Sequence, residues 1–242
     1  MTDIGGRAAR RPPGYAWLAV IPVAVTGAIA MFIASQPAVA ATAPVGLGTA
    51  ASFGVLAGTT VTNTGPSSIS GNLGVSPGTA VTGFPPGTVR NGTIHQADGV
   101  AMDAQSDLTT AYNDAAGRSP TANVPAFIGA GQTLAPGVYK ASSSLEVGGS
   151  LTLDAHGDPS AVFIFQAPST LVTDSASSIV LSGDAQACNV FWQVGSSATL
   201  GTTSAFSGSI LALTSISVDT GDTIAGRALA RNGAVTLAPP SR

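Results

Sequence analysis

Residues 74–78, Gly-Val-Ser-Pro-Gly, fit the G-x-S-x-G pattern that surrounds the nucleophile of many serine hydrolases. Such a serine lies on a turn between a strand and a helix, and the residue after it donates its backbone N–H to the oxyanion. Here that residue is Pro77, which has no N–H to donate. The following segment, TAVTGFPPG, is too rich in glycine and proline to form the helix. We therefore interpret Ser76 as a structural residue of a turn.

The other residues that could perform chemistry are few and scattered. His95 and His156 have no partner at metal-ligand spacing, and the single cysteine, Cys188, cannot complete a zinc site. Glycosidases need two acids across a cleft, but Glu146 is the only glutamate, and the aspartates at 154, 158, 184 and 222 lie in turn-like segments, where Asp usually serves the backbone. The sequence therefore predicts no enzyme activity, no metal ion and no cofactor.

The composition excludes several classes of partner. Only 9% of the residues are charged and the formal net charge is −3, so we expect no cationic surface for nucleic acid or membrane. One cysteine allows no intrachain disulfide. Its setting, AQACNVFW, indicates a buried, unreactive Cys188.

The first forty residues have the pattern of an export signal. The basic segment RAARRPPG precedes an uncharged apolar run at 15–34, and Ala38-Val39-Ala40 forms a small-x-small cleavage site. We predict a signal peptide over residues 1–40, cleavage after Ala40, and a secreted domain over residues 41–242. The apolar run is also long enough to span a bilayer, so an uncleaved anchor that keeps the protein at the cell surface is the alternative.

One amphipathic helix is predicted at about 96–116. It rests on apolar residues at three- and four-residue steps, namely Val100, Ala104, Leu108, Ala111, Tyr112 and Ala115. The remainder indicates short strands between turn residues. Segments of similar pattern begin at Val190, Ile210 and Ala228, about twenty residues apart, and an earlier one begins at Val162. Repeats of this length predict a β-solenoid, with the helix as a cover along one face.

Stacked coils would place Ser and Thr side chains in a regular array. Coils stack about 4.7–4.9 Å apart, and threonine presents a methyl and a hydroxyl in a restricted rotamer. Such a grid can hold ordered water, which is what adsorption to ice requires. The alternative is that these threonines are good strand formers on a solvated face. Alternation predicts that Leu171, Leu200 and Val218 point inward. The candidate ice-binding residues of these coils are Thr170, Thr173, Thr199, Thr202, Ser204, Ser217, Thr220, Thr223 and Thr236.

Several long segments resemble the microbial ice-binding, or antifreeze, proteins. They are VLAGTTVTNTGPSSISGNLGVSPGTAVTGFPPGTVRNGTIH, PGVYKASSSL, DPSAVFIFQ, ACNVFWQVGSSATLGTTSAFSGSILALTSISV and GRALARNGAVTL, within about residues 47–237. The resemblance implies a mainly β fold: a right-handed, discontinuous β-solenoid of triangular cross-section with one long α-helix packed alongside. Its N-terminal strands would insert beside the C-terminal coils, which adds Thr62 and Thr64 to the candidate ice-binding residues.

The same resemblance implies a site and a function. One flat face would bind ice, sometimes through T-A/G-x-T/N motifs, which Thr220–Thr223 matches and residues 64–67 and 204–207 match only with serine. The expected protein is a secreted monomer that binds ice, with no cofactor and, after signal cleavage, no membrane. It would give thermal hysteresis and inhibit ice recrystallisation. The other hypotheses are a cell-surface structural or adhesion solenoid without ice affinity, and a polysaccharide-acting β-helix enzyme.

Overall fold

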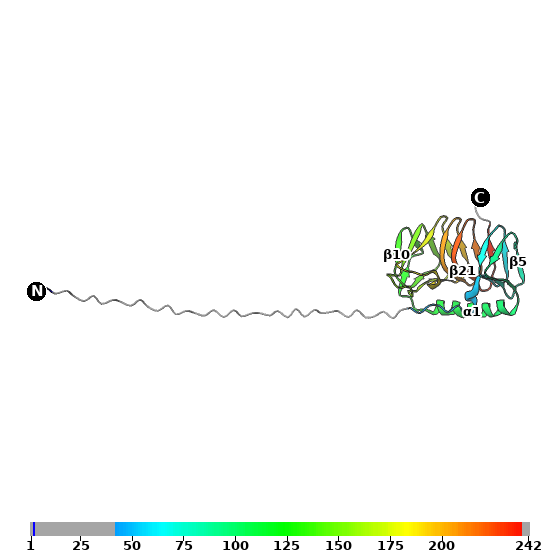
Figure 1. The fold of residues 1–242 in the computed structure, drawn as a ribbon, viewed down its shortest axis with the longest axis horizontal. Coiled ribbons are helices and arrows are strands. Elements are labelled where there is room, and N and C mark those ends of the chain that lie inside the picture. The colour runs from blue at the N-terminus through cyan, green and yellow to red at the C-terminus, as the bar shows by residue number, and fades with distance from the viewer. Residues whose placement is uncertain (1, 3–41, 239–242) are drawn as a thin grey trace. The chain divides into compact units, whose positions relative to one another are not determined.

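The structure, a computed structural model, describes residue 2 and residues 42–238. The predicted cleavage site lies outside the described residues, as does the predicted signal peptide except for Thr2. Residues 42–238 form stacked coils of short parallel strands with one α-helix alongside, and β10 and β5 lie at opposite ends of the stack (Figure 1). The fold is therefore mainly β with parallel sheets, as the sequence predicts.

The first sheet has 12 strands, all parallel. Nine of them follow in the spatial order β7 (Ile94–Gln96), β4 (Asn72–Val75), β1 (Phe53–Ala57), β21 (Thr223–Ala230), β19 (Ala205–Ala212), β17 (Val190–Val194), β14 (Phe163–Ala167), β11 (Gly137–Ala141) and β8 (Ala122–Val124). The other three join through the first half of β19, in the order β16 (Ser178–Ser182), β13 (Ser150–Asp154) and β10 (Gln132–Leu134).

The remaining strands form two further sheets. The second sheet has eight strands in the order β5 (Ala80–Thr82), β2 (Thr60–Asn63), β22 (Val235–Leu237), β20 (Ile216–Val218), β18 (Ala198–Leu200), β15 (Leu171–Thr173), β12 (Leu145–Gly148) and β9 (Phe127–Gly129). A small third sheet pairs β3 (Ser68–Ser70) with β6 (Thr88–Arg90). A coil such as β14, β15 and β16 thus contributes two strands to the first sheet, before and after the one that it contributes to the second.

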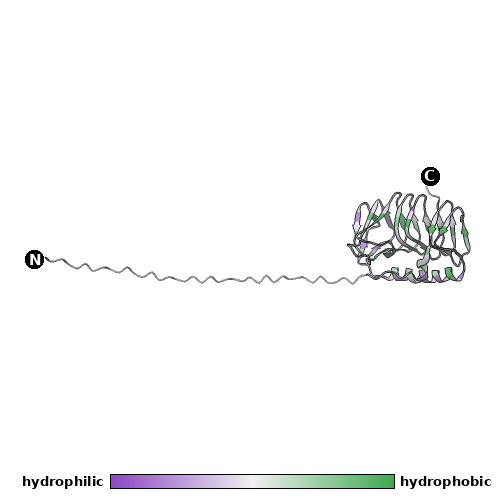
Figure 2. Ribbon diagram, viewed as in Figure 1, coloured by the Kyte–Doolittle hydropathy of each residue, from purple (hydrophilic) through white to green (hydrophobic). Residues whose placement is uncertain are grey.

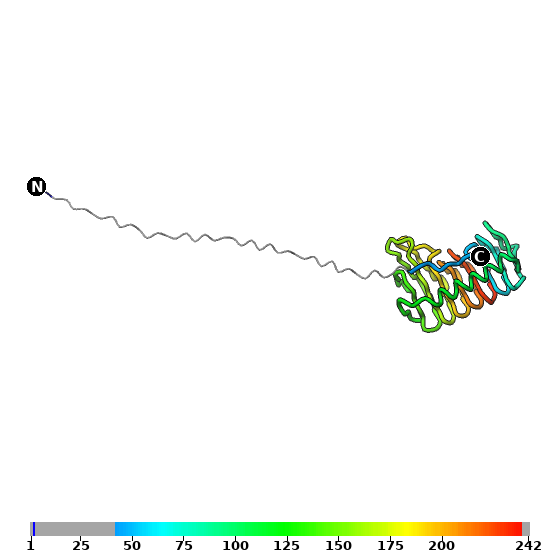
Figure 3. The backbone as a smooth tube through the Cα atoms, turned by 90° about the horizontal axis from the view of Figure 1, so that it is seen from below, coloured from blue at the N-terminus to red at the C-terminus, as the bar shows by residue number. Residues whose placement is uncertain are grey.

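The strand order is discontinuous in sequence. β1 pairs with β21 through Val55 and Ala228, and β2 pairs with β22 through Thr62 and Thr236. The coils from the two ends of the described chain therefore lie side by side, as the red and cyan coils do in Figure 3. This insertion agrees with the expectation drawn from the family resemblance.

The helix α1 (Gly99–Gly117) starts later than predicted. Strand β7 occupies the residues before it, and the Asp98 side chain caps it by accepting a hydrogen bond from the Ala101 N–H at 2.9 Å. Val100, predicted to face the core, is 47% exposed, because the buried residue of that turn is Ala101. Figure 2 shows hydrophilic and hydrophobic residues alternating along the helix.

The central part of the first sheet, around β14, β17 and the second half of β19, is buried on both faces. Its inner face holds a stack in which the rings of Phe165 and Trp192 lie 4.0 Å apart. Its outer face forms a second core with the buried side of α1, made of residues that include Leu56, Ile164, Phe191, Leu211 and Leu229. α1 runs along the coils in Figure 3. The helix is thus a cover for this sheet, as predicted.

A hydrogen bond also ties α1 to the coils. The buried Gln166 side chain donates from Nε2 to the carbonyl oxygens of Ala115 and Arg118, both at 2.8 Å. These carbonyls belong to the end of the helix, where no further turn is present to pair with them. Gln166 therefore fixes the position of the helix end.

Two glycines allow β19 and β21 to bend from one side of the coil to the next. Gly208 has a φ of +113° and pairs with Gly226 in the neighbouring coil. A Cβ added to Gly226 would lie 1.9 Å from the Gly208 carbonyl oxygen. Only glycine fits at this position without a shift of the backbone.

The structure agrees with the interpretation of Ser76 and contradicts that of Cys188. Ser76 follows β4, is 3% exposed, and donates its backbone N–H to the Ala57 carbonyl at 3.0 Å, and no helix begins after it. It is a structural residue. The prediction for Cys188 was wrong: this cysteine is exposed, because the short helix η2 (Ala187–Asn189) places it before β17 and outside the core.

Candidate functional site

The second sheet presents its outer face away from the core. In each of its central strands the first and third residues are buried and the middle residue points outward. Leu171, Leu200 and Val218 all point inward, as predicted. The middle residues of neighbouring strands pair directly, so that they form one straight row across the sheet.

Five hydroxyl side chains occupy one half of this row. In spatial order they are Thr82, Thr62, Thr236, Ser217 and Thr199. Strand pairing spaces them about 4.7–4.9 Å apart. We call these five residues the hydroxyl row.

The hydroxyl row is free of internal hydrogen bonds. Within the described residues, none of its five hydroxyls has a hydrogen-bond partner in the protein. Some hydroxyls two residues before an outward position behave differently: Thr170 Oγ1 donates to Ser144 Oγ at 2.9 Å, and Ser197 Oγ accepts from the Ser215 N–H at 3.3 Å. The hydroxyls beside the row are therefore used to tie coils together, whereas those of the row can bind water.

The other half of the outward row has a different character. It continues with Val172, Glu146 and Phe127. Val172 is 38% and Phe127 44% exposed. The regular array of hydroxyls therefore covers the strands from β5 to β18 and stops at β15.

Four of the predicted candidates lie in the hydroxyl row, namely Thr62, Thr199, Ser217 and Thr236. Two others lie beside it and make internal hydrogen bonds, Thr170 with Ser144 and Thr64 with the Leu237 carbonyl at 3.3 Å. Thr202 lies in the turn after β18, at the position that Thr220 occupies in the next coil, and donates to Ser175 Oγ at 2.9 Å. Thr170 was expected in line with Thr199, but Leu171 pairs with Ala198, which puts Val172 there instead.

The four remaining candidates do not belong to the outward row. Thr173 is 3% exposed because it faces the core one residue after Val172, and its Oγ1 accepts from the Gly201 N–H. Ser204 is 2% exposed and donates to Asp222 at 3.0 Å. Thr220 lies in the turn after β20, and Thr223 begins β21 of the first sheet, since the chain turns the corner between them. The Thr220–Thr223 motif is therefore not on the second sheet.

Thr82 was missed by the sequence analysis. Its segment, Ala80-Val81-Thr82, repeats the alternation of Thr60-Val61-Thr62, and the two strands pair residue for residue. The similarity of these two segments was the signal that could have identified it.

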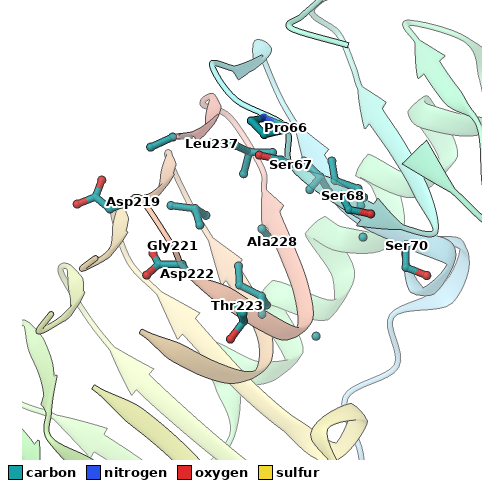
Figure 4. Close-up of a pocket in the computed structure, with 17 residues that line it drawn as sticks. Pro66, Ser67, Ser68, Ser70, Asp219, Gly221, Asp222, Thr223, Ala228 and Leu237 are labelled. Carbon is teal, nitrogen blue, oxygen red and sulfur yellow. The ribbon is translucent and has the colours of Figure 1, made fainter. Parts of the chain in front are cut away.

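The structure also brings together a threonine, a histidine and an aspartate. Thr93 Oγ1 lies 2.9 Å from His95 Nε2, and His95 Nδ1 lies 2.7 Å from Asp98 Oδ2. The hydrogen bonds from the Ala101 N–H and from His95 hold the pKa of Asp98 below its ordinary value. These residues line neither the cavity beside Asp222 (Figure 4) nor the one beside Arg227. Asp98 caps α1, and His95, which is hydrogen-bonded to Thr93, contacts the other carboxylate oxygen of Asp98.

Metal sites and membrane spans were also sought in the described part of the chain. There, no three His, Cys, Asp or Glu side chains gather closely enough to hold a metal ion. No helix in residues 42–238 has the length and hydropathy needed to cross a membrane.

The fold and the face together define a class of protein: a β-solenoid with a lateral helix and one regular, outward row of hydroxyls. Comparison with known proteins gives the family. Residues 55–240 match the family described as Ice-binding-like. The chain belongs to this family.

The similar proteins span several kinds of microbe. An ice-binding protein of Nostoc sp. (strain HG1) is 58% identical over 193 residues, which is 79% of this chain and 71% of the relative. An ice-binding protein of Flavobacterium frigoris (strain PS1) is 38% identical over 80% of this chain and 74% of its own. The crystal structure of an ice-binding protein from an Antarctic biological consortium has a TM-score of 0.79 and 53% identity, covering 82% of this chain and 90% of that one.

Proposed function

We propose that this protein is a secreted ice-binding protein that adsorbs to ice through the outer face of its second sheet, centred on the hydroxyl row. The observation that carries this proposal is the row itself: five hydroxyls, one per coil, in direct register and with no partner in the described protein. Ice is a repeating lattice, so a ligand surface with one repeat per coil can match it over several contacts at once.

The rest of the molecule makes this face rigid. Backbone pairing fixes each coil against the next, and the inward residues beside the row, including Val61, Val235, Ile216 and Ala198, are at most 1% exposed. The face therefore loses little conformational entropy on binding. Row methyl groups and the small residues beside them would shape the water that the hydroxyls anchor.

Adsorption would produce two effects. Ice growing between bound molecules becomes curved, so growth stops until the temperature falls further, which is thermal hysteresis. The same adsorption slows the exchange of water between grains and inhibits recrystallisation. No reacting group is needed, and we propose that the protein is not an enzyme.

Further parts of the proposal rest on the sequence and the family. They are a right-handed, triangular solenoid, removal of residues 1–40 as a signal peptide, secretion, and action as a monomer without nucleic acid or membrane partners. Of the eleven candidates, we propose that Thr62, Thr199, Ser217 and Thr236, together with Thr82, contact ice, and that Thr64, Thr170 and Thr202 border the contact.

The test is to hold a single ice crystal just below its melting point in a solution of the purified protein. The proposal predicts a faceted crystal that does not grow within a measurable temperature interval. A rounded disc that grows freely, as in buffer, would instead favour a structural or adhesion solenoid without ice affinity.

A further inference from the structure

A buried asparagine lies at the end of the strand that carries Thr62. Asn63 is the last residue of β2 and is 4% exposed. The residues in line with it in the next three coils are all apolar, namely Leu237, Val218 and Leu200. An amide at such a core position costs free energy unless it is hydrogen-bonded. The hydrogen bonds of Asn63 therefore indicate what this residue contributes.

The Asn63 amide joins the turn of its own coil to the neighbouring coil. Its Nδ2 donates to the carbonyl oxygen of Gly83, in the coil of β5, at 2.8 Å, and also to the carbonyl oxygen of Gly65 in the turn after β2. Its Oδ1 accepts from the Ser67 hydroxyl at 2.7 Å. Gly83 directly follows Thr82, the member of the hydroxyl row on β5. One buried amide thus holds the end of β5 against the end of β2.

The two carbonyls that accept from this amide also have backbone donors. The Gly83 carbonyl accepts from the Gly87 N–H at 2.8 Å, and the Gly65 carbonyl accepts from the Ser67 N–H at 2.8 Å. Both carbonyls would therefore keep a hydrogen-bond partner without Asn63. What the Asn63 amide adds is a link between two coils.

The backbone of the neighbouring coil fits closely around Asn63. Gly83 has a φ of +81°, and a Cβ added to it would overlap the Asn63 carbonyl oxygen. A Cβ added to Gly87 would lie 2.5 Å from Asn63 Nδ2. The loop 83–87 closes over the amide because glycine occupies both positions. This fit fixes the start of the loop, and with it Thr82, beside Thr62.

Thr82 is the member of the hydroxyl row for which such a link matters most. The other four members lie on β2, β22, β20 and β18, each of which pairs with a strand on both sides. Among the described strands, β5 pairs with β2 alone, and it is three residues long. A displacement of this short strand would take Thr82 out of line with the other hydroxyls.

We infer that Asn63 is a positioning residue for ice binding: its buried amide holds the end of β5 in place and thereby keeps Thr82 in line with the hydroxyl row. The inference rests on the proposed function, since Asn63 acts through the proposed ice contact. Asn63 itself is buried and does not touch ice. Its replacement should therefore lower thermal hysteresis by as much as Thr82 contributes to it.

Two substitutions of Asn63 remove the link in different ways. Asn63→Asp keeps the shape and the acceptor for Ser67, but an ionised carboxylate cannot donate to Gly83. Asn63→Leu places there the residue type that the next coil has at the equivalent position. Asn113→Asp makes the first change at an exposed position of α1 and is the matched control. Circular dichroism at the temperature of the ice assay identifies the variants that are folded.

Thermal hysteresis in a double-mutant cycle is the first measurement. Asn63→Asp and Asn63→Leu should each lose as much hysteresis as Thr82→Ala loses, and Asn63→Asp combined with Thr82→Ala should lose no more than either change alone. Thr199→Ala should lower the hysteresis of Asn63→Asp further, because Thr199 is held by β15 and β20. Asn113→Asp should behave as the parent does.

Hydrogen exchange followed by mass spectrometry is the second measurement. Both Asn63 variants should exchange faster than the parent within residues 80–87, where the link is lost. Exchange in β18 and β20 should stay unchanged, since these strands do not contact Asn63. A general loss of stability would instead raise exchange in all strands.

The outcomes separate this inference from the proposed function. Full hysteresis in folded Asn63→Asp or in Thr82→Ala would overturn the inference, as would additive losses in their combination. Failure of both Asn63 variants to fold would also overturn it, because the whole fold would then need the amide. Absence of hysteresis in the parent, or full hysteresis in Thr199→Tyr, would contradict the proposed function itself.

Discussion

Replacement of Leu108 by alanine should lower the stability of the solenoid and leave its proposed ice-binding face intact. Leu108 is fully buried in the core that joins α1 to the first sheet. The change removes three carbon atoms, worth about 0.8 kcal/mol each in transfer free energy. The residual cavity adds to this, so we expect a loss of about 3 kcal/mol. For a domain of this size that corresponds to a melting temperature lower by about 6–12 °C, measurable by differential scanning calorimetry.

Met102→Ala on the same helix is the matched control. Met102 is 60% exposed, so its truncation should change the free energy of unfolding by less than about 0.5 kcal/mol. Both variants should shape ice as the parent does near 0 °C, because α1 packs on the first sheet and the hydroxyl row belongs to the second. Equal melting temperatures for Leu108→Ala and the parent would refute the assigned role of this helix face.

Three further predictions concern other parts of the chain. Asp107 accepts hydrogen bonds from the Thr49 hydroxyl and N–H, which lower the pKa of its carboxyl below 3.8. The contribution of the ionised carboxylate to folding stability is therefore present at neutral pH and is lost as the pH falls through the lowered pKa. In a pH series of thermal melts, the melting temperature should fall more steeply on acidification for the parent than for Asp107→Asn. Gly226→Ala should destabilise by about 3 kcal/mol or more because its Cβ meets the Gly208 carbonyl, whereas Gly99→Ala, with nothing within 4 Å, should be neutral or stabilising in the same melts. N-terminal sequencing of secreted protein should begin at Ala41, and retention of the protein in the membrane would contradict the cleavage.

The fold could largely be predicted because its signals are local. The apolar steps of 96–116 identified the helix, and repeats of about twenty residues identified the coils. The errors arose where tertiary context decides the outcome. Because Asp98 caps the helix and fixes its start, Ala101 is buried in the core and Val100 is exposed. Cys188 is exposed because it lies in a short helix before β17, and the apolar residues around it did not predict that helix.

The candidate site could be predicted only in part because register is not local. In the segment STLVT, Thr170 and Val172 both alternate with the buried Leu171, and alternation alone cannot say which one lies in line with Thr199. The pairing of Leu171 with Ala198 decides for Val172. Thr223 is in another sheet because the chain turns at residues 219–222, and a sequence does not state where a coil turns its corner.

The most direct test of the proposed ice-binding face is the thermal hysteresis of two tyrosine variants. Thr199 lies exposed in the hydroxyl row between Ser217 and Val172, whereas Thr152 points outward from β13 on another side of the solenoid, between Thr133 and Val180. Both changes should leave the melting temperature nearly unaltered, since neither side chain is in the core. Thr199→Tyr should abolish most of the hysteresis by lifting the face from the lattice, and Thr152→Tyr should retain it. Full hysteresis in correctly folded Thr199→Tyr protein would contradict the account.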